Sequence, residues 1–235
     1  MRISIMQPGY LPWLGFFELM YNCDLFVFLD DVQYTRKDWR SRNKIRTKDK
    51  WILLTVPVLT KNKRFQLINE AEINNFEDWK KKHLYSIAIN YRKAGYFEEY
   101  FPELQDIYKK DWKYLVELDI DIIAWLSKKL GITTPVTRSS ALKTIGRKEE
   151  KIINICKALG AEELYDSKAA RSILDIRIFQ DAKIKIEFQD YIHPVYRQVY
   201  KPFIPYMSAI DLLFQYGPES LDILLGRKMA QDSIR

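Results

Sequence analysis

Residues 1–34 read MRISIMQPGYLPWLGFFELMYNCDLFVFLDDVQY. The apolar runs at residues 2–6 and 24–29 predict two buried strands. Between them, two prolines and a glycine in residues 7–13 exclude regular structure, and residues 14–21 predict a short helix. A strand, a helix and a strand in succession are typical of an α/β fold with a parallel sheet.

Polar and aromatic side chains follow each of these predicted strands. Those after the first strand are Gln7, Tyr10 and Trp13, and those after the second are Asp30, Asp31 and Gln33. Ligands of open parallel sheets bind outside the carboxyl ends of the strands. We therefore expect a binding site in these two loops.

The rest of the chain continues the α/β pattern. Apolar periodicity predicts helices at 76–93, 97–109, 113–130, 147–159, 169–180, 208–214 and 219–229, and strands at 51–58, 133–137, 163–165 and 184–188. Ser208 is the expected N-cap of the helix that contains Asp211. The prediction is a Rossmann-like, mostly parallel sheet with flanking helices. One domain spans residues 1–235, with a helical subdomain at about 72–130.

The composition of the chain indicates its localisation, the state of its cysteines and whether it binds a metal. The chain has no apolar run of about 18 residues and no signal-peptide pattern, so we expect a cytoplasmic protein without membrane insertion. Cys23 and Cys156 lie far apart and are expected to be buried thiols. No histidine or cysteine cluster has the spacing of metal ligands, so no metal site is predicted.

The net charge of +7 suggests an anionic partner, although a basic solvated surface would give the same value. Eight of the basic residues fall within residues 35–50, around Trp39. The guanidinium groups of Arg40 and Arg42 suit the bidentate recognition of a diphosphate. The alternative is a solvated basic loop.

The two histidines have two interpretations each. His83 shares an apolar helix face with Trp79, Ile87 and Tyr91, which is typical of a hydrogen-bonded core residue. His193 precedes a proline in an irregular aromatic segment. Either imidazole could instead be a general base, because its pKa is near neutrality. Asp30 and Asp31 similarly suit either ligand binding and base catalysis or the capping of a turn.

Several segments resemble the WbqC-like protein family. They are QPGYLPW at 7–13, FLDDVQ at 28–33, WRSRN at 39–43, the pair Trp79 and His83, HPVYRQ at 193–198 and FIPYMSAIDLLF at 203–214. The similarity spans nearly the whole chain. One departure is Ser167-Lys168, where many relatives have Ser-Gly. The opening is also similar, at the level of fold, to nucleotidyltransferases of the pantothenate synthetase group, but it lacks their His-x-Gly-His motif.

The family resemblance implies a part in surface polysaccharide synthesis, such as that of O-antigen. The expected reaction is transfer of an acyl or aminoacyl group, possibly glycyl, to the amine of a nucleotide-linked amino sugar. His193 or His83 would be the base, and Asp30 is a further candidate catalytic residue. The expected substrate-binding residues are Gln7, Tyr10, Trp13, Asp31, Gln33, Trp39, Arg40, Arg42, Asn43, Tyr196, Gln198 and Asp211.

The acyl donor is left open between coenzyme A, an adenylate and aminoacyl-tRNA. The first alternative function is a non-catalytic module that binds a nucleotide or RNA through the basic segment. The second is a nucleotidyltransferase-like enzyme that uses Mg²⁺ and a different phosphate contact.

Overall fold

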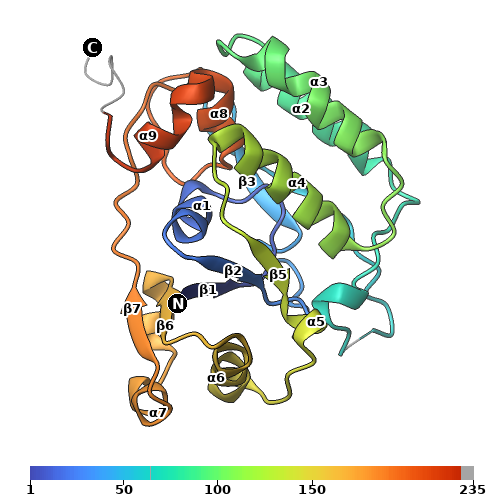
Figure 1. Ribbon diagram of the computed structural model, residues 1–235. Coiled ribbons are helices and arrows are strands. Elements are labelled where there is room, and N and C mark those ends of the chain that lie inside the picture. Colours follow the sequence, from blue (N-terminus) through green and yellow to red (C-terminus); the bar gives the residue numbers. More distant parts are fainter. Residues whose placement is uncertain (64, 229–235) are drawn as a thin grey trace. The chain divides into compact units, whose positions relative to one another are not determined.

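The computed structural model describes residues 1–63 and 65–228 (Figure 1). These residues form two compact units. Unit 1 contains Met1–Pro8, Gly15–Val32 and Thr133–Ile192. Unit 2 contains Gly9–Leu14, Gln33–Ile132 and the described residues from His193 onward. Within the described part of the chain, no helix is both long and apolar enough to cross a membrane.

Unit 1 is built on a five-stranded sheet in which every neighbouring pair of strands is parallel. The strand order is β5-β2-β1-β6-β7 (Figure 1). The bounds are β1 (Arg2–Met6), β2 (Leu25–Phe28), β5 (Val136–Arg138), β6 (Glu163–Asp166) and β7 (Lys185–Phe188). The predicted α/β fold with a parallel sheet is confirmed.

Alternation along β1 directs its side chains to two helical layers. Ile3 and Ile5 belong to the apolar core that also contains residues of α6 (Lys148–Leu159) and α7 (Ile176–Asp181). Ser4 points to the opposite face, where its hydroxyl contacts the Leu19 carbonyl of α1 (Leu14–Tyr21) at 3.3 Å. Successive residues of a strand face opposite sides, so one short strand holds helices on both faces of the sheet.

Unit 2 combines an antiparallel hairpin with helices. The hairpin pairs β3 (Arg42–Arg46) with β4 (Trp51–Thr55). The helices are α2 (Trp79–Tyr91), α3 (Phe97–Lys109), α4 (Leu115–Leu130), α8 (Ile210–Tyr216) and α9 (Ser220–Leu224). The predicted apolar face of α2 is confirmed, because Trp79, His83, Ile87 and Tyr91 are its buried residues.

Three local predictions were wrong. Residues 42–46 form a strand inside the segment expected to be a basic loop, because they pair with β4. Residues 169–180 do not form one helix. The 3-10 helix Lys168–Ser172 is followed by a separate helix, α7. Its N-cap is Asp175, whose side chain accepts a hydrogen bond from the Arg177 amide. Cys156 is buried as expected, but Cys23 is only half-buried.

The C-terminal helices also differ from expectation. Ala209, and not Ser208, is the N-cap of α8, while the Ser208 amide donates to the Lys44 carbonyl at 2.9 Å. The last helix is shorter than predicted and is confined to Ser220–Leu224. The predicted end of that helix, at residue 229, lies outside the described residues.

Candidate functional site

The carboxyl ends of the central strands in unit 1 carry polar groups. The chain runs from β1 outward to β2 and β5, then continues on the other side of β1 with β6 and β7. Gln7 directly follows β1, and Asp166 is the last residue of β6. Such a reversal of strand order is where open α/β sheets bind ligands. Burial raises the pKa of Asp166 to about 6. Sequence reasoning missed this carboxyl, although it directly follows the strand predicted at 163–165.

Asp30 and Asp31 follow β2 and hold the segment after β5. Asp30 is fully buried and accepts hydrogen bonds from Nε of Arg138 at 2.6 Å and from the Ser140 amide at 3.0 Å. Asp31 forms an ion pair with Nζ of Lys151 at 2.6 Å. These contacts resemble the capping interpretation more than that of a free base. The catalytic role of Asp30 stays a prediction.

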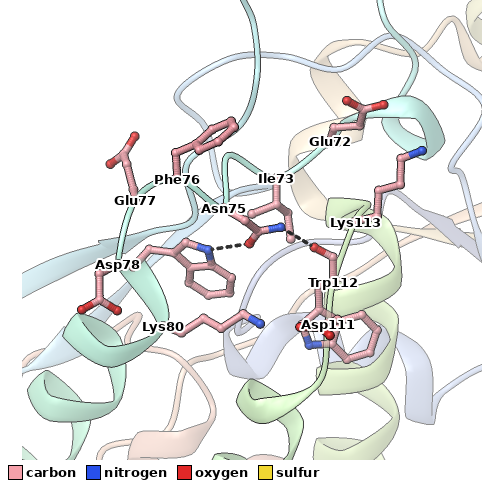
Figure 2. Close-up of a pocket in the computed structure, with 11 residues that line it drawn as sticks. Glu72, Ile73, Asn75, Phe76, Glu77, Asp78, Lys80, Asp111, Trp112 and Lys113 are labelled. Atoms are coloured by element: carbon pink, nitrogen blue, oxygen red, sulfur yellow. Dashed lines mark hydrogen bonds between the residues drawn. The ribbon is translucent and has the colours of Figure 1, made fainter.

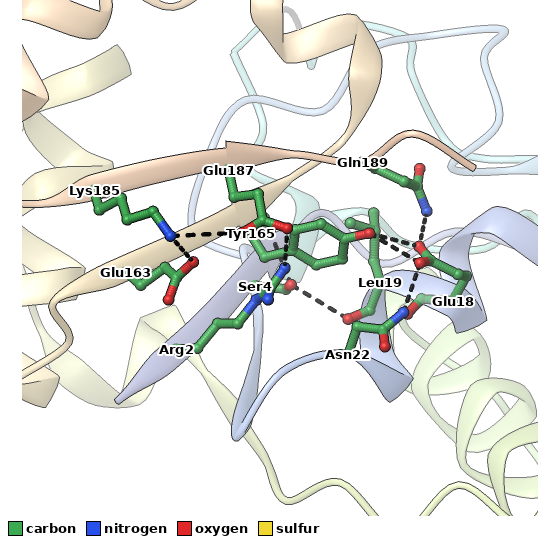
Figure 3. Close-up of polar contacts among 10 residues, drawn as sticks. All are labelled: Arg2, Ser4, Glu18, Leu19, Asn22, Glu163, Tyr165, Lys185, Glu187 and Gln189. Atoms are coloured by element: carbon green, nitrogen blue, oxygen red, sulfur yellow. Dashed lines mark hydrogen bonds and ion pairs between the residues drawn. The ribbon is translucent and has the colours of Figure 1, made fainter.

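A second polar network in unit 1 surrounds Glu18, which sequence reasoning also missed (Figure 3). The Glu18 carboxylate accepts hydrogen bonds from the Tyr165 hydroxyl at 2.9 Å, from Gln189 and from Asn22 at 2.5 Å. The guanidinium of Arg2 lies 4.0 Å from the centroid of the Tyr165 ring. This network joins α1 to the ends of β6 and β7.

In unit 2, backbone contacts bring together segments that are far apart in the sequence. Trp13 forms an isolated antiparallel bridge with Ser208, and the Ala209 amide donates to the Pro12 carbonyl at 2.8 Å. Nδ2 of Asn43 donates to the Leu11 carbonyl at 2.8 Å. The loop Gly9–Leu14, the hairpin and the start of α8 are therefore tied to one another.

The segment around Trp39 also belongs to this group of loops. The Tyr10 amide donates to the Arg40 carbonyl at 3.2 Å. A Cβ atom on Gly9 would overlap the Trp39 ring, so a larger residue there would displace that ring. The predicted site residues Tyr10, Trp13, Trp39 and Asn43 are thus neighbours along these tied segments.

Two of these segments contain strained backbone. Leu11 has a φ of 46° and Tyr206 a φ of 61°, which is the left-handed region that favours glycine. Such a conformation costs roughly 1–3 kcal/mol for other residues and is concentrated at functional sites. The strain therefore marks the paired loops around Trp13 and Ser208 as a candidate site.

Five aromatic rings gather beside these loops and are called the His193 cluster: Trp13, His193, Tyr196, Phe203 and Tyr206. The imidazole stacks on Trp13 with 6.4 Å between ring centroids, and it contacts Tyr206 edge-on at 5.1 Å. Tyr206 is 56% exposed, and Trp13 and His193 are half-buried. The cluster is therefore partly exposed to solvent.

The partners of His193 determine its tautomer. Nδ1 lies 2.9 Å from the Pro194 carbonyl, which can only accept, so Nδ1 carries the proton. Nε2 accepts a hydrogen bond from the Tyr206 amide at 3.2 Å. Burial lowers the pKa of His193. The ring is therefore a neutral imidazole whose basic nitrogen is Nε2.

His83 has a more buried environment. Its Nδ1 lies 2.8 Å from the Tyr10 hydroxyl, which also contacts the hydroxyl of Tyr108. Trp79 packs edge-on against the ring at 5.4 Å. Burial lowers the pKa of His83 to about 4. This is the environment of a core histidine, and the role of His83 as a base stays a prediction.

Three predicted binding residues meet in a buried network below the His193 cluster. Asp211 accepts hydrogen bonds from the hydroxyls of Tyr91 and Tyr196, each at 2.9 Å, and from Nε2 of Gln198 at 2.8 Å. Oε1 of Gln198 accepts from Nε of Arg46 at 3.3 Å. Since Tyr196, Gln198 and Asp211 are buried, this network supports the cluster from within.

Several side chains of the basic segment form contacts within the protein. Arg46 is fully buried, Arg40 pairs with Asp38, and Arg42 donates to the Lys37 carbonyl. Gln33 is exposed and, with Arg36, lines a hollow of about 470 Å³. Among the described residues, no group of three or more His, Cys, Asp or Glu side chains could hold a metal ion.

Comparison with known proteins supports the family resemblance that the sequence motifs of these loops indicated. The model of the WbqC-like protein family matches residues 7–223. Uncharacterized protein Rv1507c of Mycobacterium tuberculosis is 35% identical over 225 residues, which cover 95% of this chain and 97% of that protein. No solved structure gives a significant match. The chain therefore belongs to the WbqC-like protein family.

Proposed function

We propose that this protein transfers an acyl or aminoacyl group to the amine of a nucleotide-linked amino sugar during the synthesis of surface polysaccharide. The observation that carries the proposal is His193: a neutral imidazole with a basic Nε2, in a partly exposed aromatic cluster beside strained loops. A neutral imidazole nitrogen of this kind can act as the general base in acyl transfer.

In this proposal, the substrate amine takes the place of the Tyr206 amide at Nε2 of His193. That hydrogen bond is 3.2 Å long, at the weak end of the normal range. Nε2 would accept the proton that the amine loses as it attacks the acyl carbonyl. The amide C–N bond forms, the bond between the acyl carbon and the carrier of the activated donor breaks, and the imidazolium returns its proton to the departing carrier. The bond from Nδ1 to the Pro194 carbonyl would hold the ring and stabilise the imidazolium that forms.

The aromatic faces of Trp13 and Tyr206 would bind the flat part of the nucleotide-sugar by stacking. Arg42, close to these loops in the hairpin, would contribute positive charge toward the diphosphate. Asp211 and Gln198 would act as positioning residues, because they are buried behind the cluster. The acyl donor is left open, as in the sequence prediction.

The test is a transfer assay with the full-length protein. UDP- and dTDP-linked amino sugars are incubated with acetyl-coenzyme A, or with glycyl-tRNA, and the sugar nucleotide is followed by mass spectrometry. We expect a mass gain of one acyl group that is lost in His193→Gln. The glutamine oxygen can still accept from the Tyr206 amide but cannot act as a base at neutral pH.

A matched variant is His83→Gln, which we expect to retain transfer if it folds, as checked by circular dichroism. Activity that survives in His193→Gln would overturn the role of His193. The transferase proposal itself fails if no amino-sugar nucleotide in the panel raises the melting temperature, since a bound ligand stabilises the folded state.

A further inference from the structure

Unit 2 contains a cavity that none of the predicted site residues lines. It has a volume of about 640 Å³ and lies between the segment before α2 and the connection from α3 to α4 (Figure 2). Pockets for small ligands range over about 300–1,000 Å³. The cavity is therefore large enough for a ligand of one or two rings.

Hydrogen bonds hold the two sides of this cavity together. Nδ2 of Asn75 donates to the Trp112 carbonyl at 2.8 Å, and its Oδ1 accepts from Nε1 of Trp79 at 3.3 Å. The Ile73 amide donates to the Lys113 carbonyl at 2.9 Å. Figure 2 shows Asn75 between the two sides. The cavity is thus formed before any ligand binds.

Aromatic side chains form its apolar surface. Phe76 is 95% exposed, and Trp112 is half-buried with its Nε1 donating to the Ile107 carbonyl at 2.9 Å. The loop that presents Phe76 is held by the Asn74 amide, which donates to the Pro57 carbonyl at 2.8 Å. An apolar ring exposed in an ordered loop gains favourable free energy when a ligand covers it.

The polar lining offers both acceptors and donors. Four carboxylates and two lysines line the cavity, so its charge is negative in a chain of net charge +7. In Figure 2, Asp78 lies on one side and Asp111 on the other, with Lys80 extending between them. No ion pair within the described chain involves Asp78 or Asp111.

We infer that this cavity binds a carbohydrate ring, neutral or amine-bearing. The apolar faces of Phe76 and Trp112 would cover the C–H face of the sugar, while Asp78, Asp111 and Lys80 would bind its hydroxyls. The acidic lining would repel a phosphate or carboxylate. The site is therefore distinct from a diphosphate site, and the inference does not rest on the proposed transferase reaction.

The test is ¹⁹F NMR of the full-length protein labelled with 5-fluorotryptophan. The chain has six tryptophans, and Trp112→Phe assigns the signal of Trp112. The probes are glucose, glucosamine and glucuronate, added at constant pH and ionic strength. We expect saturable shifts of the Trp112 signal with glucose and glucosamine, and binding at least about tenfold weaker with glucuronate.

Phe76→Ala is the variant of choice, because an exposed side chain can be removed without unfolding the protein. Loss of the covered ring should weaken sugar binding by about tenfold or more. The matched control is Phe65→Ala, which removes another exposed phenylalanine of unit 2 outside the cavity and should leave binding unchanged. The inference is overturned if no sugar shifts the Trp112 signal, if glucuronate binds as tightly as glucose, or if Phe76→Ala binds like the unmodified chain.

Discussion

The Tyr10 hydroxyl and Nδ1 of His83 form a hydrogen bond across 2.8 Å, inside a buried part of unit 2. Burial lowers the pKa of His83 to about 4, so the imidazole is neutral near neutral pH. The bond ties the loop Gly9–Leu14 to α2.

Removing the Tyr10 hydroxyl should therefore destabilise the protein. In Tyr10→Phe, Nδ1 of His83 and the hydroxyl of Tyr108 lose a buried partner, which costs about 1–3 kcal/mol. Urea unfolding measures the loss. The control is Tyr85→Phe on the same helix, where the exposed hydroxyl should change stability by less than about 0.5 kcal/mol. Equal effects of the two changes would show that the buried bond contributes nothing.

Asp119 on α4 should make stability depend on pH. Its side chain is fully buried, and neither carboxylate oxygen has a hydrogen-bond partner among the described residues. Burial raises its pKa well above the ordinary value. The unfolded chain has the ordinary value of about 3.9, so above this pH it loses the proton first. The free energy of unfolding should therefore fall as pH rises from about 4 toward the pKa of the folded state.

The variant Asp119→Asn removes this titration. Relative to the unmodified chain, we expect it to gain stability by up to about 1.4 kcal/mol per pH unit above pH 4. Urea unfolding between about pH 4 and 8 gives the difference, and the opposing titrations of other groups cancel because both proteins contain them. Asp106→Asn on the exposed face of α3 is the control. A difference between Asp119→Asn and the unmodified chain that stays constant with pH would contradict the prediction.

Because the backbone of Tyr206 is left-handed, a glycine variant at this position should be more stable than an alanine variant. Glycine usually destabilises a folded segment relative to alanine, but at a φ of 61° alanine is the strained residue. Tyr206→Gly should therefore be more stable than Tyr206→Ala by about 1 kcal/mol. Both variants lose the ring contacts with Trp13 and His193, so their difference in thermal unfolding reports the backbone alone. An alanine variant of equal or greater stability would refute the strain.

Arg46 should be among the most sensitive positions of the hairpin. Its guanidinium donates to Gln198 at 3.3 Å and to the carbonyls of Lys50 and Pro202, each at 2.8 Å. Removing one member of a buried charged network costs about 3–5 kcal/mol. We expect Arg46→Ala to lose stability by this amount in urea unfolding.

Two further variants separate the network of Arg46 from a general effect of charge. Lys48→Ala removes an exposed positive charge from the same hairpin and should change stability by less than about 0.5 kcal/mol. Arg46→Lys keeps the charge but loses the planar fork, so its stability should lie between those of Arg46→Ala and the unmodified chain. If Lys48→Ala lowers the free energy of unfolding as much as Arg46→Ala does, the buried network is not the cause of the lost stability.

Local patterns were sufficient to predict most elements of the fold. The apolar runs of β1 and β2 and the periodicity of α2, α3 and α4 lie within short segments, where the alternation of side chains reports directly which face is buried. Where elements depend on distant partners, prediction failed. β3 is rich in basic residues and forms because β4 pairs with it, and the start of α8 shifted because the Ser208 amide bonds to Lys44.

The sequence by itself determined the strand–turn–helix–strand opening, the aromatic and polar loops after it, and the identity of the two histidines. Only the tertiary structure decided what each group can do. It buried Arg46, Asp119 and His83, and it left His193 half-exposed with a defined tautomer. Burial, hydrogen-bond partners and pKa depend on atoms contributed by segments that are far apart in the sequence, such as Arg46 and Gln198, which are 152 residues apart. Periodicity within a segment carries no information about such contacts.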